Sequence, residues 1–262
     1  MILSRAAAHL KSLHWTGFFI EIVIVVVGVF IGIQASNWNA DRENQRKGVE
    51  LAARLRHDLE EDLKGREQMV TYYVAVKDSA ERADTLLASS APDPRALVVN
   101  AYRASEFSYF GTTRAAWDQV VSSGELGILP QGIDLAAVST YYAYDSSKDT
   151  KDTIQNSPYR MQVRRIIPYA VQKAIRAGCS DELDEFGLVR GFKTECRLDV
   201  SDAQIAEAAN ALKQAPDLAP DLRLHFSAIN SAIDNMSGDV FLLKKTIASF
   251  DGNAATTPAA KP

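Results

Sequence analysis

Residues 17–35 read GFFIEIVIVVVGVFIGIQA, an apolar run in which only Glu21 is charged. As an α-helix, the run would rise about 28 Å, which matches the hydrocarbon core of a bilayer. A core helix of a soluble protein usually keeps a polar face, and a signal peptide should end at a small-x-small cleavage site, which is poorly formed here. We therefore expect residues 17–37 to form a retained single-pass transmembrane helix after a short N-terminal segment, residues 1–16.

Small and polar residues line one face of this expected helix. At 100° per residue, they point within about 20° of a single direction. They are Glu21, Gly28, Gly32 and Asn39. Gly28 and Gly32 have the small-xxx-small spacing that lets two helix backbones approach closely. The stripe predicts packing against a second copy of the chain or another membrane protein; the alternative is that Glu21 is simply hydrated at the membrane edge and the glycines have no partner.

Aromatic and amide side chains mark both ends of the apolar run. Trp15 and Trp38 lie where interfacial aromatic residues gather, and Gln34 and Asn37 lie where the helix would leave the bilayer. Amide groups at that depth can bond lipid headgroups or a neighbouring helix. We expect these four residues at the membrane interface, either as a plain anchor or as an assembly contact.

The charges near the apolar run and the two cysteines indicate on which side of the membrane the rest of the chain lies. The first 16 residues are basic with no acid, which favours a cytoplasmic N-terminus, whereas a count of Lys and Arg alone gives more on the body side and argues the reverse. Cys179 and Cys196 are the only cysteines, and an even pair that closes a short loop suits an oxidising compartment. We predict a disulfide rather than two buried thiols, and a periplasmic body on a bacterial inner-membrane protein.

The rest of the chain reads as helices. Residues 39–89 contain no proline, and their apolar residues recur every three or four positions, which predicts one long helix running out of the transmembrane helix. We also expect one helix over residues 133–156, a helix kinked at Pro168, a last long helix over residues 221–250, and no strands. The expected fold class is all-α: an N-terminal transmembrane helix continuing into a long helix of an elongated bundle, in which the long first and last helices pair.

The bundle domain would span residues 38–250 and be followed by a disordered tail, residues 251–262. Within it, the acidic run Glu60, Glu61 and Asp62 is expected to be a solvated face. The net charge of −4 gives no hint of the basic surface that a nucleic-acid partner needs. Catalytic, phosphate-binding and metal-binding motifs are absent from the sequence. We therefore expect no enzyme, no cofactor, no metal site and no nucleic-acid partner.

The most site-like group in the body is aromatic. It combines one arginine with tyrosines and a tryptophan from neighbouring segments, which could line a pocket for a small acidic or aromatic ligand. The members are Arg114, Trp117, Tyr141, Tyr142 and Tyr144. The alternative, and the more common case, is that such a set is the core where short helices pack.

Two stretches carry a family resemblance. Residues 21–42, EIVIVVVGVFIGIQASNWNADR, resemble the N-terminus of a family of uncharacterised bacterial single-pass membrane proteins, which share Glu-Ile, an apolar span and Gln-x-x-Asn-Trp-Asn. Residues 113–126, TRAAWDQVVSSGEL, are similar to a second segment of that family. The resemblance implies a single-pass helical protein and implies no activity.

These observations lead to two functional hypotheses. The first is a membrane-anchored scaffold or accessory subunit, which acts by interaction with the bilayer, with a second copy or with a membrane protein. The alternative is an extracytoplasmic ligand-binding sensory module that acts through a membrane partner, a role argued only by analogy with other helical bundles.

Overall fold

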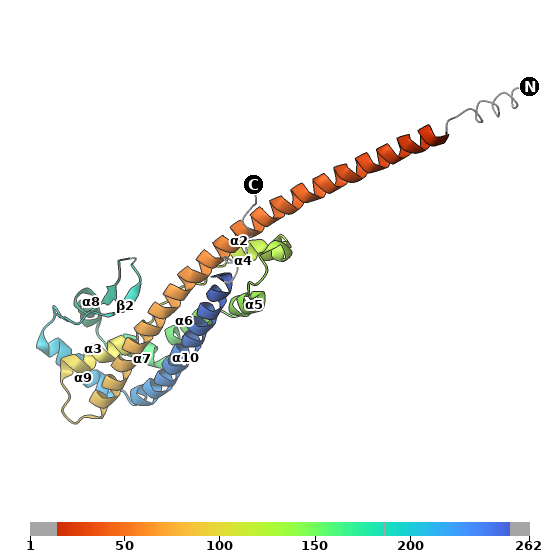
Figure 1. Cartoon of the computed structure of the whole chain (residues 1–262). Helices are drawn as coiled ribbons and strands as arrows, with labels where there is room; N and C mark the ends of the chain where they lie inside the picture. Colours follow the sequence, from red (N-terminus) through yellow and green to blue (C-terminus); the bar gives the residue numbers. More distant parts are fainter. Residues whose placement is uncertain (1–14, 186, 252–262) are drawn as a thin grey trace, which may run out of the picture.

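The structure is a computed structural model in which residues 15–185 and 187–251 are described. Most of the expected N-terminal segment, residues 1–14, and of the expected tail, residues 252–262, lies outside the described residues. The described chain is an elongated bundle of helices with one two-stranded hairpin, and one helix projects far beyond the bundle (Figure 1). The expected all-α fold is therefore confirmed.

The helix that organises the fold is α2, Trp15–Ala88, which runs for 74 residues without a break. It contains no proline, and Leu51, Leu55 and Leu59 lie on the face that is fully buried against the other helices. The N-terminal part of α2 projects, and the C-terminal part is the spine of the bundle (Figure 1). The apolar run and the long helix after it are one continuous element, as the sequence predicted.

The last helix, α10, Leu218–Asp251, packs antiparallel along α2, which confirms the expected pairing of the long first and last helices (Figure 1). Shorter elements fill the sequence between them. They are α3 Pro94–Ala104, α4 Ala115–Ser122, the 3-10 helix η1 Glu125–Ile128, α5 Leu135–Ala143, α6 Ser146–Gln155, α7 Pro158–Ile166, α8 Tyr169–Gly178, β1 Asp181–Leu183, β2 Val189–Phe192 and α9 Asp202–Gln214.

Buried apolar side chains form two clusters along α2. The proximal cluster, nearer the projecting part, includes Leu51 to Leu59 of α2 with residues of α4, α5 and α10. The distal cluster includes α2 residues from Met69 to Ala83 with residues of α3, α7, α8, α9 and α10. Between Leu59 and Met69, the side chains of α2 that are fully buried are polar: Asp62 and Arg66.

Two expected helices are each divided in the structure. Residues 133–156 form α5 and α6 rather than one helix, because Tyr144 is extended and the Asp145 side chain accepts a hydrogen bond from the backbone N–H of Lys148, which starts a new helix. At Pro168 the expected kink is a full break between α7 and α8. Proline lacks an N–H group and disfavours helical backbone in the preceding Ile167, which is extended here.

The expectation of no strands is wrong for the segment between the cysteines. β1 and β2 pair antiparallel there, from Asp181 opposite Phe192 to Leu183 opposite Val189. The connecting turn has Gly187 in the left-handed region at φ 78°, which glycine adopts without strain. Strands of three and four residues are too short to show an alternating pattern in sequence, so only the tertiary contacts reveal them.

A buried histidine makes the distal cluster sensitive to acid. His225 of α10 is 1% exposed, and its Nε2 donates to the carbonyl oxygen of Ala104 at 2.9 Å. Its ring centroid lies 5.2 Å from that of Tyr159. Burial, with a smaller contribution from the charge of Arg160, lowers the pKa of His225 to about 4. The imidazole is therefore neutral in the folded protein at neutral pH.

We predict that His225 makes the free energy of unfolding fall by roughly 3 kcal/mol between pH 6.5 and 4. The unfolded chain takes up this proton near pH 6.5 and the folded chain only near pH 4, so the contribution is complete above pH 6.5 and is lost as the pH drops. In urea denaturation, the stability difference between the wild type and His225→Gln should shrink from neutral pH to pH 4. A difference that stays constant would contradict this.

Candidate functional site

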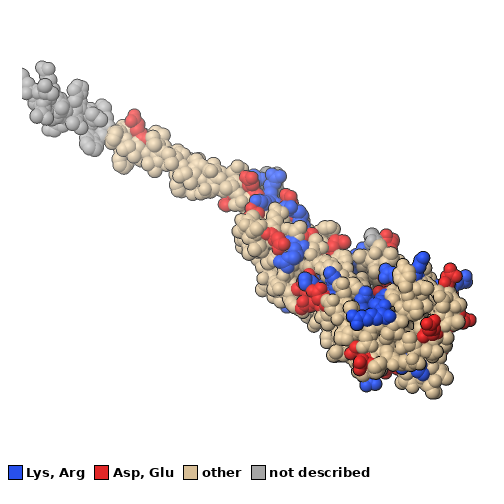
Figure 2. Space-filling view, turned by 180° about the vertical axis from the view of Figure 1, so that it is seen from behind, with Lys and Arg blue, Asp and Glu red and all other residues tan. Residues whose placement is uncertain are grey.

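The projecting part of α2 carries the apolar run on its surface. Its large apolar side chains from Phe18 to Ile33 are between 44% and 69% exposed. Among the described residues, α2 is the one helix that is long and apolar enough to cross a membrane. Figure 2 shows that this part is almost free of charged atoms, which gather where the helix meets the bundle.

The residues expected at the membrane all lie on this projecting helix. Trp15 is its first residue, and the guanidinium of Arg42 lies 4.9 Å from the ring centre of Trp38. A Cβ atom built on Gly28 or Gly32 would meet nothing within 4 Å, so no other described residue covers that face. The remaining members of the two predicted groups are exposed on the same helix: Glu21, Gln34, Asn37 and Asn39.

A short exposed stalk, residues 36–47, joins the projecting part to the bundle. The bundle begins at Gly48, where a Cβ atom would lie 1.9 Å from the carbonyl oxygen of Ile128, so the end of η1 can approach only a glycine. Lys47 forms an ion pair with Glu125 at the same point, and this contact lowers the pKa of Glu125.

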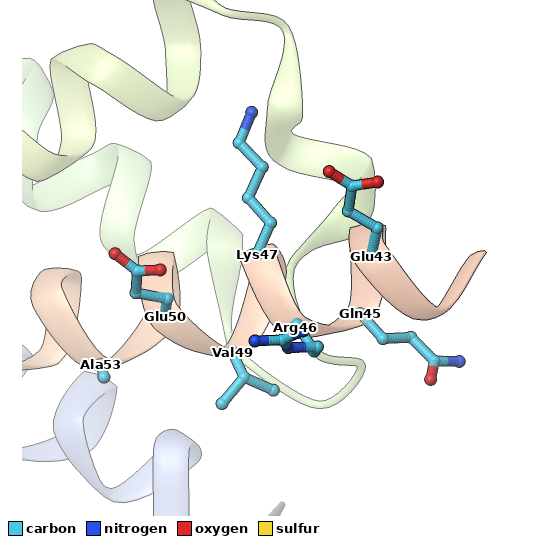
Figure 3. Close-up of a pocket in the computed structure, with 7 residues that line it drawn as sticks. All are labelled: Glu43, Gln45, Arg46, Lys47, Val49, Glu50 and Ala53. Atoms are coloured by element: carbon cyan, nitrogen blue, oxygen red, sulfur yellow. The ribbon is translucent and has the colours of Figure 1, made fainter. Parts of the chain in front are cut away.

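The stalk itself offers no enclosed site. Figure 3 shows side chains that line a surface hollow at its base, with Glu43 and Lys47 on one side of α2 and Gln45 and Val49 on the other. Because they diverge around a single helix, they cannot converge on one small ligand.

The predicted aromatic pocket is packed core. The rings of Trp117 and Tyr142 stack with centroids 5.5 Å apart, and Tyr141 meets Tyr142 edge-on at 5.1 Å. These three residues are at most 8% exposed and belong to the proximal cluster. The guanidinium of Arg114 lies 5.3 Å from the Tyr142 ring centre. Tyr144, in contrast, is 54% exposed, and its hydroxyl donates a hydrogen bond to the carboxylate of Asp149. The structure brings four of the five together, and their buried rings leave little surface for a ligand.

Sequence reasoning missed a buried polar group beside this cluster. Glu60 and Glu61 are exposed as expected, but Asp62 is fully buried, so the expectation of a solvated face is wrong for that residue. The signal that could have revealed it is the spacing of Asp58, Asp62 and Arg66, four residues apart on one face of α2. We call Asp62, Arg66, Asp145 and Asp239 the polar layer.

Arg66 is the centre of the polar layer. Its Nη1 donates to the carbonyl oxygen of Phe110 at 2.8 Å and its Nη2 to the hydroxyl of Thr112 at 2.7 Å. Its Nε lies 3.3 Å from a carboxylate oxygen of Asp239, and its Nη2 lies 3.6 Å from one of Asp145. A guanidinium that is 1% exposed thus contacts three separate segments: the loop of residues 110–112, Asp145 at the start of α6, and Asp239 within α10.

Asp62, one turn before Arg66 on α2, contacts the end of the same loop at Thr113. It accepts hydrogen bonds from the backbone N–H of Thr113 at 2.9 Å and from the hydroxyl of Tyr141 at 2.8 Å. Burial raises the pKa of Asp62, and these hydrogen bonds counteract the rise. Burial likewise raises the pKa of Asp239, which also accepts a hydrogen bond from Ser146. The charges of the layer compensate one another, although Arg66 Nε makes an ion pair without a hydrogen bond among the described residues, and the arrangement suits a structural role.

In the structure, Cys179 and Cys196 are joined by a disulfide with their Cα atoms 4.5 Å apart. The bond connects the end of α8 to the segment after β2. It therefore pins the hairpin to the helical bundle at the end remote from the projecting helix (Figure 1).

We predict that Arg66→Met lowers the free energy of unfolding by about 3–5 kcal/mol, because it leaves buried carboxylates without their counter-charge. The matched control is Arg223→Met, since Arg223 is on α10 with a side chain that is 74% exposed, and it should cost no more than about 1 kcal/mol. Urea denaturation of both full-length variants in detergent micelles measures the difference. Equal losses would show that the polar layer does not stabilise the fold.

Of the comparisons with known proteins, one gives a match, and the matched range includes Asp62 and Arg66 of the polar layer. No curated protein and no solved structure shows significant similarity to the chain. A family of unknown function (DUF6090) matches residues 21–148, a range that contains most of the apolar run, Asp62, Arg66 and the aromatic cluster and that ends within α6.

Proposed function

We propose that the chain is a single-pass protein of the bacterial inner membrane, with its helical bundle in the periplasm, which acts by interaction as a scaffold or accessory subunit. The observation that carries the proposal is the continuity of α2, whose exposed apolar part and buried spine are one helix. A surface of this size and hydrophobicity needs a covering, and a lipid bilayer matches its length.

The spacing along α2 supports this arrangement. With residues 17–35 in the hydrocarbon core, the stalk of residues 36–47 would hold the bundle about 18 Å beyond it. In this arrangement Trp38 and the neighbouring amides would lie among the lipid headgroups, where such side chains are favourable. The bundle would start just outside the headgroup layer.

The disulfide supports the periplasmic placement. Disulfide bonds persist in oxidising compartments and are rare where thiols are kept reduced. The bond between Cys179 and Cys196 closes a short loop and ties the end of α8 to the segment after β2. If the bundle lay in the cytoplasm, the two cysteines would be kept reduced and this link would be lost.

An interaction role also fits the candidate site. The aromatic cluster that suggested a ligand pocket has its rings packed together, so it gives the sensory alternative no support. The proposed partners are the bilayer and, on the face of Gly28 and Gly32, a second copy or another membrane protein. We propose no catalytic role, since neither the motifs nor the compensated polar layer supplies a reactive group.

We predict that the protein fused at its C-terminus to alkaline phosphatase is active and stays in the membrane pellet after alkaline carbonate extraction. Val25→Asp combined with Val29→Asp should release most of it, because each charge costs roughly 3 kcal/mol at the centre of a bilayer helix. Both valines are more than half exposed, so the bundle loses no contact.

The control is Val49→Asp, which introduces the same charge at a residue of α2 that is 61% exposed but lies beyond the stalk. It should remain in the pellet. Wild-type protein in the supernatant would overturn the anchor, and an inactive phosphatase fusion in the pellet would overturn the periplasmic placement.

We further predict that Gly28→Ile combined with Gly32→Ile weakens self-association in a membrane two-hybrid assay, because the added side chains keep the helix backbones apart. Val26→Leu, on the opposite side of the helix, should have little effect. A signal that the double variant leaves unchanged would rule out this face as the contact between copies.

A further inference from the structure

A small polar cavity lies at the end of the bundle remote from the apolar run, where α3, α8 and the disulfide hairpin meet (Figure 1). Its volume is about 50 Å³, enough for a few water molecules or the charged end of one small solute. The lining residues that matter here are Arg103, Glu106, Arg176, Cys179, Asp181 and Phe192.

Guanidinium groups outnumber carboxylates around this cavity. Arg103 and Arg176 line it, and Arg160 and Arg164 of α7 reach the lining residue Glu106, with 3.1 Å between Arg164 Nη2 and a Glu106 carboxylate oxygen. The acidic groups are Glu106 and Asp181. With every group ionised, these four arginines and two carboxylates give the site an excess of positive charge, which attracts an anion.

Several buried polar atoms at the site lack a hydrogen-bond partner. Within residues 15–185 and 187–251, Nε of the lining residue Arg103 has no acceptor, and neither has Nε of Arg164, which lies behind the lining residue Glu106. The hydroxyl of Tyr72 has no partner in the same set, and Tyr72 is fully buried against Phe192. Native proteins rarely leave buried donors unsatisfied, so their clustering at one cavity points to a ligand that accepts hydrogen bonds.

Arg103 and Arg164 are held in place before any ligand arrives. Arg103 Nη2 donates to the carbonyl oxygens of Lys193 at 2.8 Å and Cys179 at 3.3 Å, and its guanidinium lies 5.0 Å from the ring centre of Phe192. Arg164 lies 3.6 Å from the ring centre of Tyr102. The disulfide of Cys179 fixes the hairpin that supplies these contacts. Planar guanidinium groups fixed in this way suit the paired oxygens of a carboxylate or a phosphate.

We propose that this cavity, the oxyanion pocket, binds the phosphate or carboxylate group of a small free solute through the lining residues Arg103 and Arg176. A headgroup of the anchoring bilayer is excluded as the source if the proposed anchor is correct. Tyr72 lies about 55 Å along α2 from the end of the apolar run at Ala35, far beyond the reach of a lipid headgroup.

The negative charge of Asp181 should repel a bound anion, so a variant without that charge tests the proposal. Burial raises the pKa of Asp181 to about 6, and the charge of Glu106 adds to the rise, while Arg176, Arg103 and Arg164 lower it. At pH 7 the ionised carboxylate still repels a bound anion. Asp181→Asn keeps the shape of the side chain and removes that repulsion, so binding should become tighter. A purely structural role for the cluster predicts no such gain.

The test is isothermal titration calorimetry on the full-length protein in detergent micelles at pH 7 and constant ionic strength, with inorganic phosphate and succinate as separate titrants. We expect saturable binding of at least one; the tighter of the two identifies the phosphate or the carboxylate group as the preferred ligand. Arg176→Gln should weaken binding about tenfold, the size expected for one charge-assisted hydrogen bond. Asp181→Asn should strengthen it.

The matched control is Arg190→Gln, on β2 of the same hairpin but outside the cavity lining. Both arginines are exposed, so neither variant is expected to impair folding, which thermal unfolding verifies. Absence of saturable binding of both anions at tens of millimolar would overturn the proposal. Equal weakening by Arg176→Gln and Arg190→Gln would also overturn it, because that result shows diffuse surface charge. Neither outcome depends on the membrane anchor.

Discussion

The fold depends on a compensated charge at the centre of the bundle. Arg66 loses its water on burial, and a buried guanidinium is tolerated only where acceptors and counter-charges surround it. The carbonyl of Phe110, the hydroxyl of Thr112 and the carboxylates of Asp145 and Asp239 come from separate segments. These segments must therefore meet at one point of α2. Apolar contacts in the two clusters are more interchangeable and fix the register of the long helices less sharply.

The polar layer also lies between the two apolar clusters and therefore separates the two ends of the bundle. Toward the projecting helix, the proximal cluster packs short helices against α2 and leaves Gly48 as the first buried residue of the bundle. Away from it, the distal cluster supports the hairpin and the oxyanion pocket. Because α2 runs without a break from the proposed anchor to Tyr72, which packs against the lining residue Phe192, one continuous helix links the anchor to the region of the pocket.

Local signals explain which helices could be predicted. The capping box at Ser201 and Gln204, the glycine after α4 and the proline-free pattern of α2 act within a few residues, so the sequence alone reveals them. The division at Asp145 could not be foreseen, because that carboxylate also faces Arg66 from a distant part of the chain. Asp62 was misread for the same reason: its acidic neighbours are solvated, and its own partners come from the 113–141 region.

The sequence by itself determined the helical class, the continuity of the apolar run with the long helix, and the pairing of the first and last helices, because periodicity and breakers are local properties of the chain. Only the tertiary structure decided which charged residues are buried, that Trp117, Tyr141 and Tyr142 pack as core, and that arginines of α3, α7 and α8 gather beneath a hairpin. The physical reason is that desolvation and charge compensation depend on partners far away in sequence, which no local pattern records.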